Sequence, residues 1–230
     1  MTRALLDNWV VMSVPDAREL VDGTTAYAPV QGSQPVQYVQ KAATAQLLDR
    51  VAKANEAVLS KLHVSRQHPE LKSTFDPKMS LQDLAIVGSE QPDVAWPAFR
   101  ALWSELTATS ATKIPTGGFQ PFKPRPPMLI TVDGISHWMQ TTKYFSPEFK
   151  PIHAHDFVFI NHFLSLCSNP ASSMPNGGVA LFATSFSNNP SVRTFDVGLA
   201  ELHYRCHGQP LDPHRIPTPG PYETLDPRTR

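Results

Sequence analysis

The chain has 230 residues, and its 20 Lys and Arg residues balance 20 Asp and Glu residues, so the formal net charge is zero at pH 7. This balance excludes a global attraction to nucleic acid or an anionic membrane; DNA is not an expected partner, and any RNA contact must be local. No apolar run reaches the roughly 18 residues that a membrane span needs, and two cysteines, Cys167 and Cys206, favour a reducing compartment over secretion.

The first predicted elements are the last turns of a helix at Thr2 to Leu6 and a buried strand at Trp9 to Val14. Pro15-Asp16 ends this strand, and an extended loop follows. A mitochondrial presequence is Arg-rich, Ser-rich and poor in acids, and none precedes the strand. We therefore expect an N-terminally incomplete chain without a targeting sequence of its own.

Three helical segments are predicted next. Apolar residues keep helical spacing from Val39 to Leu62 and are interrupted at Asn55, which indicates one long helix or two short ones. Ser80 with Asp83 three residues later has the pattern of a capping box at a helix start. From Val94 to Leu106 an apolar face recurs, and Pro97 falls in the first turn of the segment, where proline is tolerated. We interpret the last two as crossover helices.

A Pro/Gly-rich connection, residues 113–127, follows these helices. Lys123 and Arg125 make it the most plausible local RNA contact in a chain without net charge. The competing interpretation is an ordinary solvated loop, and the sequence favours that interpretation.

The most informative segment is the apolar run that starts at Pro126 and ends on Asp133-Gly134. It predicts a strand buried on both faces that places one carboxylate at its carboxyl end, where open α/β sheets bind ligands. This is the pattern of a Walker B strand, whose acid binds Mg²⁺ at nucleotide phosphates; Asp133 is the only metal ligand that we predict. The phosphate-binding pattern G-x-x-x-x-G-K-[ST] occurs nowhere in the chain.

A helix at Ile152 to Leu166 and a third buried strand at Val179 to Ser185 complete the pattern. Strands that alternate with helices predict an α/β fold with a three-layer, parallel, P-loop NTPase-like sheet and crossover helices. We assign residues 1–205 to this partial domain and residues 206–230 to a Pro-rich irregular tail.

Two features of the strand ends bear on chemistry. In many P-loop ATPases an acid after the Walker B residue activates water, but Gly134 stands there, so we expect little or no hydrolysis and no catalytic residue. Thr184, Ser185 and Asn188 follow the third strand, where a sensor residue would contact a γ-phosphate. Ser and Asn also gather at such junctions because they form local turns, and this alternative stays open.

Histidines between positions 153 and 162 suggest a metal site, but their spacing argues against one. His153 and His155 are two residues apart and do not share a helix face, whereas helical zinc ligands are four apart. Neither a G-x-S-x-G motif nor a cysteine protease signature is present, so an independent hydrolase is not expected.

In order along nearly the whole chain, these segments resemble the mitochondrial small-subunit ribosomal protein of the death-associated protein family, in its fungal form. The segments that carry the resemblance are 9–17, 24–29, 37–40, 125–134, 153–156, 175–178 and 187–190. The resemblance implies a GTP- and Mg-binding P-loop protein of the mitochondrial small ribosomal subunit that contacts rRNA and neighbouring ribosomal proteins. It implies that Asp133 is the Walker B acid and that Thr184 and Ser185 lie in the sensor region.

The resemblance also implies parts that these residues do not contain. The family's P-loop would precede Met1 by about one helix, and its C-terminal helical lid would follow Arg230, so the predicted fold is incomplete at both ends. We expect that the chain as given binds neither GTP nor Mg. The leading hypothesis is a structural ribosomal constituent of the mitochondrial matrix. The alternatives are a regulatory P-loop GTPase or ATPase that is active only at full length, and a binding module without a nucleotide role.

Overall fold

The computed structural model describes residues 1–71, 76, 78–109, 123–168 and 170–184, together with positions 192, 197, 198, 200, 204 and 208. The elements in these ranges alternate between strands and helices. In chain order they are α1 (Thr2–Leu6), β1 (Val10–Val14), η1 (Ala17–Leu20), β2 (Ala28–Pro29), β3 (Tyr38–Val39), α2 (Lys41–Ala54), α3 (Glu56–Leu59), η2 (Pro69–Leu71), α4 (Leu81–Glu90), η3 (Pro92–Val94), α5 (Ala95–Leu106), β4 (Met128–Asp133), η4 (Ile135–Trp138), β5 (Thr141–Phe145), β6 (Pro151–His153), η5 (Ala154–Asp156), α6 (Val158–Ser168), α7 (Pro170–Ser173) and β7 (Gly178–Ala183).

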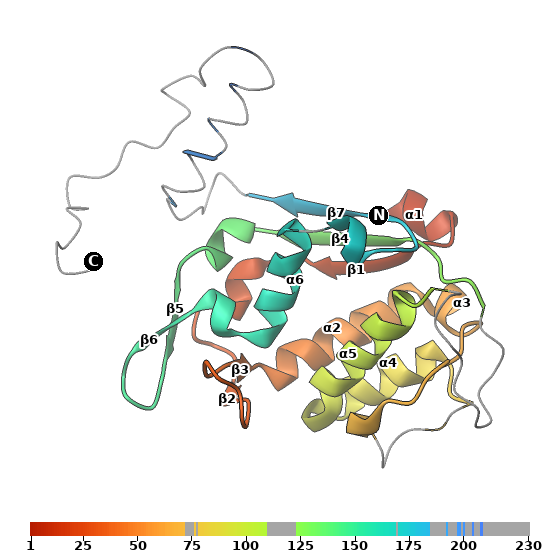
Figure 1. Cartoon of the computed structure of the whole chain (residues 1–230), viewed down its shortest axis with the longest axis horizontal. Helices are drawn as coiled ribbons and strands as arrows, with labels where there is room; N and C mark the ends of the chain where they lie inside the picture. Colours follow the sequence, from red (N-terminus) through yellow and green to blue (C-terminus); the bar gives the residue numbers. More distant parts are fainter. Residues whose placement is uncertain are drawn as a thin grey trace.

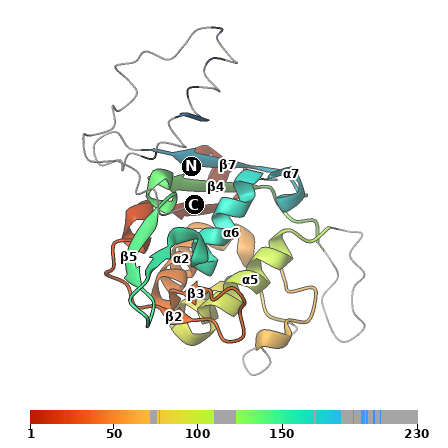
Figure 2. The same ribbon diagram turned by 60° about the vertical axis from the view of Figure 1, so that its left-hand side comes forward.

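The centre of the fold is a parallel sheet of three strands in the order β1-β4-β7. Met128 pairs with Val10 of β1 and Gly178 of β7, and the register continues without a shift to the carboxyl ends of the strands. Helices α2, α5 and α6 lie on one side of this sheet in both ribbon views (Figure 1; Figure 2). The predicted α/β class with a parallel sheet and crossover helices is confirmed.

The sheet is buried unevenly. In β4, four apolar residues from Met128 to Val132 are buried, as the sequence predicts for a central strand. In β7, Ala180 and Phe182 pack against the core, but Val179 and Leu181 are 42% and 54% exposed. The prediction that the third strand is buried is therefore wrong for one of its faces, because β7 is at the edge of the described sheet.

The helices below the sheet follow local sequence signals. Helix α2 ends at Ala54 and α3 begins at Glu56, so the interruption at Asn55 is real. The Asn55 side chain accepts from the Val11 N–H (2.7 Å) and donates to the Val11 carbonyl (2.9 Å), which caps the free edge of β1. Asn55 therefore ends one helix and joins it to the sheet.

Helix α4 shows the predicted capping box. The Asp83 N–H donates to the Ser80 hydroxyl oxygen (3.0 Å), and the Asp83 carboxylate accepts from the Ser80 N–H (3.2 Å). Near the other end of the helix, a Cβ on Gly88 would lie 2.5 Å from Leu48 and 2.6 Å from Ala98. Only glycine lets α4 approach α2 and α5 this closely.

The predicted helix at Ile152 to Leu166 is only partly correct. Its first residues form β6, which pairs with β5 in an antiparallel hairpin that the sequence did not predict. The Asp156 carboxylate then accepts from the His153 N–H (3.2 Å) and closes the short turn η5, so α6 begins only at Val158. Cross-strand pairing outweighs the local helical pattern here.

Candidate functional site

The carboxyl ends of the three parallel strands form the candidate site. The Gly134 N–H donates to the Ala183 carbonyl (2.9 Å), so the residues after β4 and β7 lie side by side. Gly134 has a φ of 77°, a left-handed conformation that costs other residues free energy, and it lets the chain turn sharply into η4. Asp133 pairs with Ala183, so Asp133 and Thr184 lie at the same edge of neighbouring strands; their predicted roles in binding nucleotide stay a prediction.

Asp133 is exposed, and it has no hydrogen bond or ion pair with any described residue. One pleat earlier on the same face, the Thr131 hydroxyl donates to the Ser13 hydroxyl of β1 (2.9 Å). A carboxylate whose lone pairs are all free can coordinate a hard cation such as Mg²⁺. Asp133 is therefore available to a cation, and its role as a Mg²⁺ ligand stays a prediction; the pattern G-x-x-x-x-G-K-[ST] does not occur in these 230 residues.

Thr184 is half-buried next to this edge. Ser185 and Asn188, the other predicted sensor residues, lie outside the described residues. Their contact with a phosphate therefore stays a prediction.

A cavity of about 380 Å³ lies at the carboxyl end of β1. Its lining includes Asp16 and Arg18 from the start of η1, Arg50 from α2 and Phe159 from α6. Asp133 is not among the lining residues, although Val14, which lines the cavity, pairs with Val132 just before it. Acids and arginines both line the cavity, and this mixture favours no single charge class of ligand.

Lys123 and Arg125, the predicted RNA contacts, have different surroundings. Lys123 is exposed, and its ammonium donates to the Lys61 carbonyl (3.1 Å). The side chain of Arg125 is only 1% exposed and pairs with Glu105 at 2.6 Å. The exposed loop position that the sequence predicted for Arg125 is wrong, because this guanidinium neutralises a buried acid.

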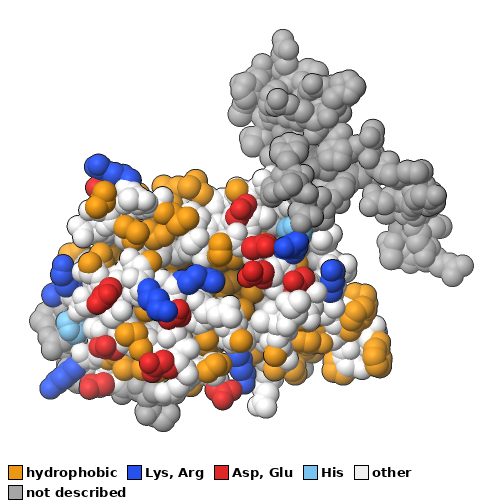
Figure 3. Space-filling model, turned by 180° about the vertical axis from the view of Figure 1, so that it is seen from behind, with side chains coloured by type: hydrophobic (Ala, Val, Ile, Leu, Met, Phe, Trp, Pro, Cys, Tyr) orange, Lys and Arg blue, Asp and Glu red, His pale blue; other side chains and the backbone are white. Residues whose placement is uncertain are grey.

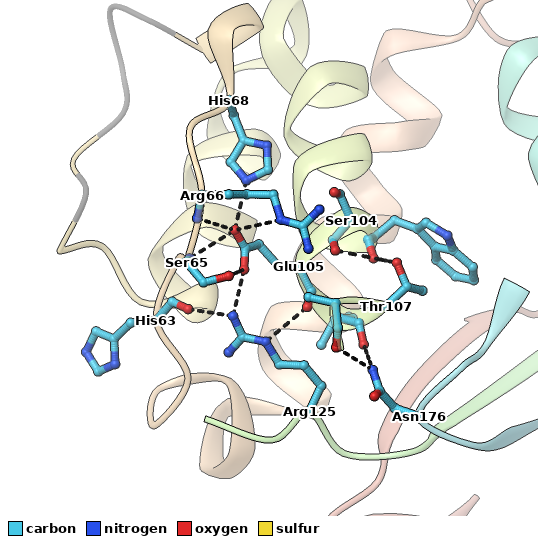
Figure 4. A network of polar contacts seen from close by, with 12 residues as sticks. His63, Ser65, Arg66, His68, Ser104, Glu105, Thr107, Arg125 and Asn176 are labelled. Carbon is cyan, nitrogen blue, oxygen red and sulfur yellow. Dashed lines mark hydrogen bonds and ion pairs between the residues drawn. The ribbon is translucent and has the colours of Figure 1, made fainter. Parts of the chain in front are cut away.

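Glu105 is the centre of a polar network that the sequence analysis missed (Figure 4). Its carboxylate accepts from the Ser65 N–H (3.0 Å), the Ser65 hydroxyl (2.7 Å) and the Arg66 N–H (3.1 Å). His68 Nε2 lies 3.1 Å from the same group. Arg125 also donates to the carbonyls of His63 (2.8 Å) and Glu105 (3.0 Å), so the network joins α5, the segment after α3 and the approach to β4.

The environment of Glu105 acts on its pKa in two directions. Burial raises the pKa of the carboxyl, but the hydrogen bonds from His68 and Ser65 and the charge of Arg125 outweigh burial. The pKa therefore lies below its ordinary value, and the carboxylate stays charged at neutral pH. One signal in the sequence could have identified this residue: Glu105 falls on the apolar face of α5 next to Leu106, where an acid requires a partner.

The histidines do not converge. His153 and His155 stack at 5.1 Å between ring centroids near the hairpin, whereas His162 lies among the rings of Trp103 (4.5 Å) and Phe99 (5.0 Å). Burial lowers the pKa of His162 to about 4. Among the described ranges, no group of three or more His, Cys, Asp or Glu side chains is arranged to bind a metal ion. In the same ranges, no helix is both long and apolar enough to cross a bilayer.

Comparison with known proteins gives two matches. The sequence model of the family described as "Mitochondrial ribosomal death-associated protein 3" matches residues 1–229. The small ribosomal subunit protein mS29 of Neurospora crassa is 34% identical to this chain over 223 residues, which are 97% of the chain and 44% of that protein. The chain thus spans less than half the length of this curated relative.

Proposed function

Because the chain belongs to the mitochondrial ribosomal death-associated protein 3 family, we propose that it is a structural constituent of the mitochondrial small ribosomal subunit. The observation that carries this proposal is the 34% identity to a small ribosomal subunit protein, which extends over 97% of the chain. It follows that the protein acts in the mitochondrion, in contact with rRNA and neighbouring ribosomal proteins.

Sedimentation of mitochondrial ribosomes tests the proposal. The chromosomal copy is epitope-tagged in the source organism, mitochondria are lysed, and ribosomes are separated on sucrose gradients with and without Mg²⁺. We expect the protein to sediment with the intact ribosome and, after subunit dissociation, with the small-subunit rRNA. Recovery at the top of the gradient, or with the large subunit, would refute the structural role.

We further propose that the sheet is of the P-loop NTPase type and that its site binds nucleotide without efficient turnover. Asp133 would hold Mg²⁺ at the phosphates of GTP in the full-length protein, with Thr184, Ser185 and Asn188 near the γ-phosphate. Mg²⁺ would neutralise phosphate charge there. Support comes from the exposed, unpaired carboxylate of Asp133 at the carboxyl end of β4. Gly134 has no side chain to act as a base, so the nucleotide would serve assembly rather than catalysis.

The second candidate is a regulatory GTPase or ATPase, which the free carboxylate of Asp133 also favours. Single-turnover hydrolysis by the full-length protein distinguishes the two candidates. A rate at the background level, unchanged in Asp133→Asn, supports the structural role. A rate above background that falls in Asp133→Asn, with unchanged sedimentation, would establish the regulatory enzyme instead.

A further inference from the structure

The β5–β6 hairpin, residues 141–153, presents an exposed face that neither the sheet nor the proposed nucleotide site uses. Figure 1 shows the hairpin extending from the end of β4 to the margin of the molecule, and Figure 3 shows hydrophobic side chains gathered at that margin. Side chains alternate along β5, with Thr142 and Tyr144 buried and Lys143 and Phe145 exposed. The outward face therefore carries a cation next to an aromatic ring.

Phe149 at the hairpin tip is held in an unusual position. Its side chain is 86% exposed, and its φ of 58° is in the left-handed region that a bulky residue rarely occupies. Ser146 fixes the turn, because its N–H donates to the Lys150 carbonyl (2.8 Å) and its carbonyl accepts from the Phe149 N–H (2.9 Å). Three-residue hairpin loops commonly place their last residue in this left-handed conformation, so the turn itself accounts for the φ of Phe149. A bulky aromatic ring in solvent at this position has no packing role in the loop.

The base of the hairpin is anchored to the body. The Tyr27 hydroxyl donates to the Phe145 carbonyl, and the Tyr144 hydroxyl accepts from the Thr25 N–H (3.0 Å). The Lys143 N–H donates to the Val21 carbonyl (2.9 Å). The rings of Tyr144 and Phe157 pack at 5.2 Å. Because the base is fixed in this way, the tip presents Phe149 at low entropic cost.

The charges at this face fit a polyanion. Lys143 is exposed on the outward face, and His153, which pairs with Thr141, is exposed on the same face. Lys150 lies opposite Ser146 and faces the other way, while Glu148 is the one acid of residues 141–153. Protein interfaces are typically depleted in lysine, whereas single-stranded RNA is bound by aromatic rings that stack on bases and by cations that follow the phosphates. The combination favours RNA over a protein partner.

We propose that the outward face of residues 141–153 binds an unpaired segment of RNA, with a base stacked on Phe149 and the phosphates beside Lys143. The identification of this RNA as small-subunit rRNA rests on the proposed function. Glu148 opposes binding through its charge, so the site is weak by itself and is completed by the surrounding particle.

Ultraviolet crosslinking of purified mitochondrial small subunits tests the proposal, because short-wavelength crosslinks form only between a base and a side chain in contact with it. We expect mass spectrometry to find nucleotide adducts on Phe145 or Phe149. If the protein sediments with the small subunit but residues 141–153 carry no nucleotide adducts, this inference is overturned and the proposed function stays intact. Chemical crosslinks from Lys143 or Lys150 to another protein would then assign the face to a protein partner. A protein that does not sediment refutes both.

Matched variants of the full chain separate stacking from charge, with a labelled single-stranded RNA of twelve nucleotides as the probe and fluorescence anisotropy as the readout. Phe149→Ala should weaken binding by roughly tenfold, whereas Phe149→Tyr keeps a stacking ring and stays within about twofold. Glu148→Gln should tighten binding, and Lys143→Gln should reduce its salt dependence. Val36→Ala changes an apolar residue that is 53% exposed outside the hairpin, and should have no effect. Equal losses in the Val36 and Phe149 variants would overturn the proposal.

Discussion

Two carboxylates, Asp133 and Glu105, occupy opposite environments in this molecule. Asp133 ends β4 in solvent and has no partner among the described residues, whereas Glu105 on α5 is fully buried and bonded to Ser65, Arg66 and Arg125. A buried carboxylate whose lone pairs are already used stabilises the fold and cannot accept another ligand without breaking its network. A free carboxylate at a strand end contributes little to the fold and can bind a cation. The number of partners, more than the residue type, separates the two roles.

Removing the charge of Glu105 should give the largest effect. Glu105→Gln removes the negative charge that pairs with the buried Arg125 guanidinium, and we expect a loss of about 3–5 kcal/mol in the free energy of unfolding, measured with urea. The double variant Glu105→Leu with Arg125→Met removes both charges and should recover more than half of that loss. A Glu105→Gln variant as stable as the parent chain would show that the network is dispensable.

The stability that the Glu105 carboxylate contributes changes with pH in a defined direction. The pKa of Glu105 is lower in the folded state than in the unfolded state, so the carboxylate stabilises the fold above its unfolded pKa. This stability is lost as the pH falls through the folded pKa. Glu105→Gln should therefore lessen the acid sensitivity of unfolding, measured as the urea midpoint across this pH range.

Asn55 tests whether a buried polar group without charge behaves like Glu105. Asn55→Ala removes the bonds to the Val11 N–H and carbonyl and leaves these edge groups of β1 unpaired, which should cost about 3 kcal/mol. Asn55→Asp keeps an acceptor for the Val11 N–H but loses the donor to the Val11 carbonyl. If the bond to the N–H contributes most of the stability, Asn55→Asp should destabilise the fold less than Asn55→Ala does. Urea unfolding of the three chains ranks them.

His162 extends the comparison to a buried group that is stable only when neutral. Because burial lowers its pKa from 6.5 to about 4, the unfolded chain binds more protons than the folded chain between these values. The protein should lose on the order of 2 kcal/mol of stability as the pH falls from 6.5 to about 4, somewhat less than the full shift because the ring is partly exposed. His162→Leu should flatten this part of the profile, and an unchanged slope would contradict the assignment.

Asp133→Asn should have the smallest effect on stability, within about 0.5 kcal/mol, because no described residue bonds to its carboxylate. The same substitution should abolish Mg²⁺-dependent nucleotide binding by the full-length protein, measured by calorimetry. Gly134→Ala is the matched control at the next position: it strains a backbone with φ 77° and should cost about 1 kcal/mol without removing the metal ligand. If Asp133→Asn destabilises more than Gly134→Ala, the acid has a structural role.

The candidate site was predictable as far as local patterns reach. The apolar run before Asp133 predicts a strand that ends at the ligand-binding edge of the sheet. That β7 is the neighbour of β4, which brings Thr184 beside Asp133, came only from the structure. Ser185 and Asn188 lie outside the described residues, so their part of the site stays a prediction. The hairpin was not predicted, because its pairing of Thr141 with His153 has no periodic signal of its own.

The sequence by itself determined the elements whose signals lie within a few residues: the strand that ends at Asp133 and the capping box of Ser80 and Asp83. It marked an interruption at Asn55 but left open whether one helix or two occupy that segment. Only the tertiary structure decided which charges are used up within the fold. Arg125 and Glu105 are twenty residues apart and meet through the packing of α5 against the approach to β4. Burial and ion pairing depend on such contacts between distant segments, and these contacts leave no periodicity in the sequence from which they could be predicted.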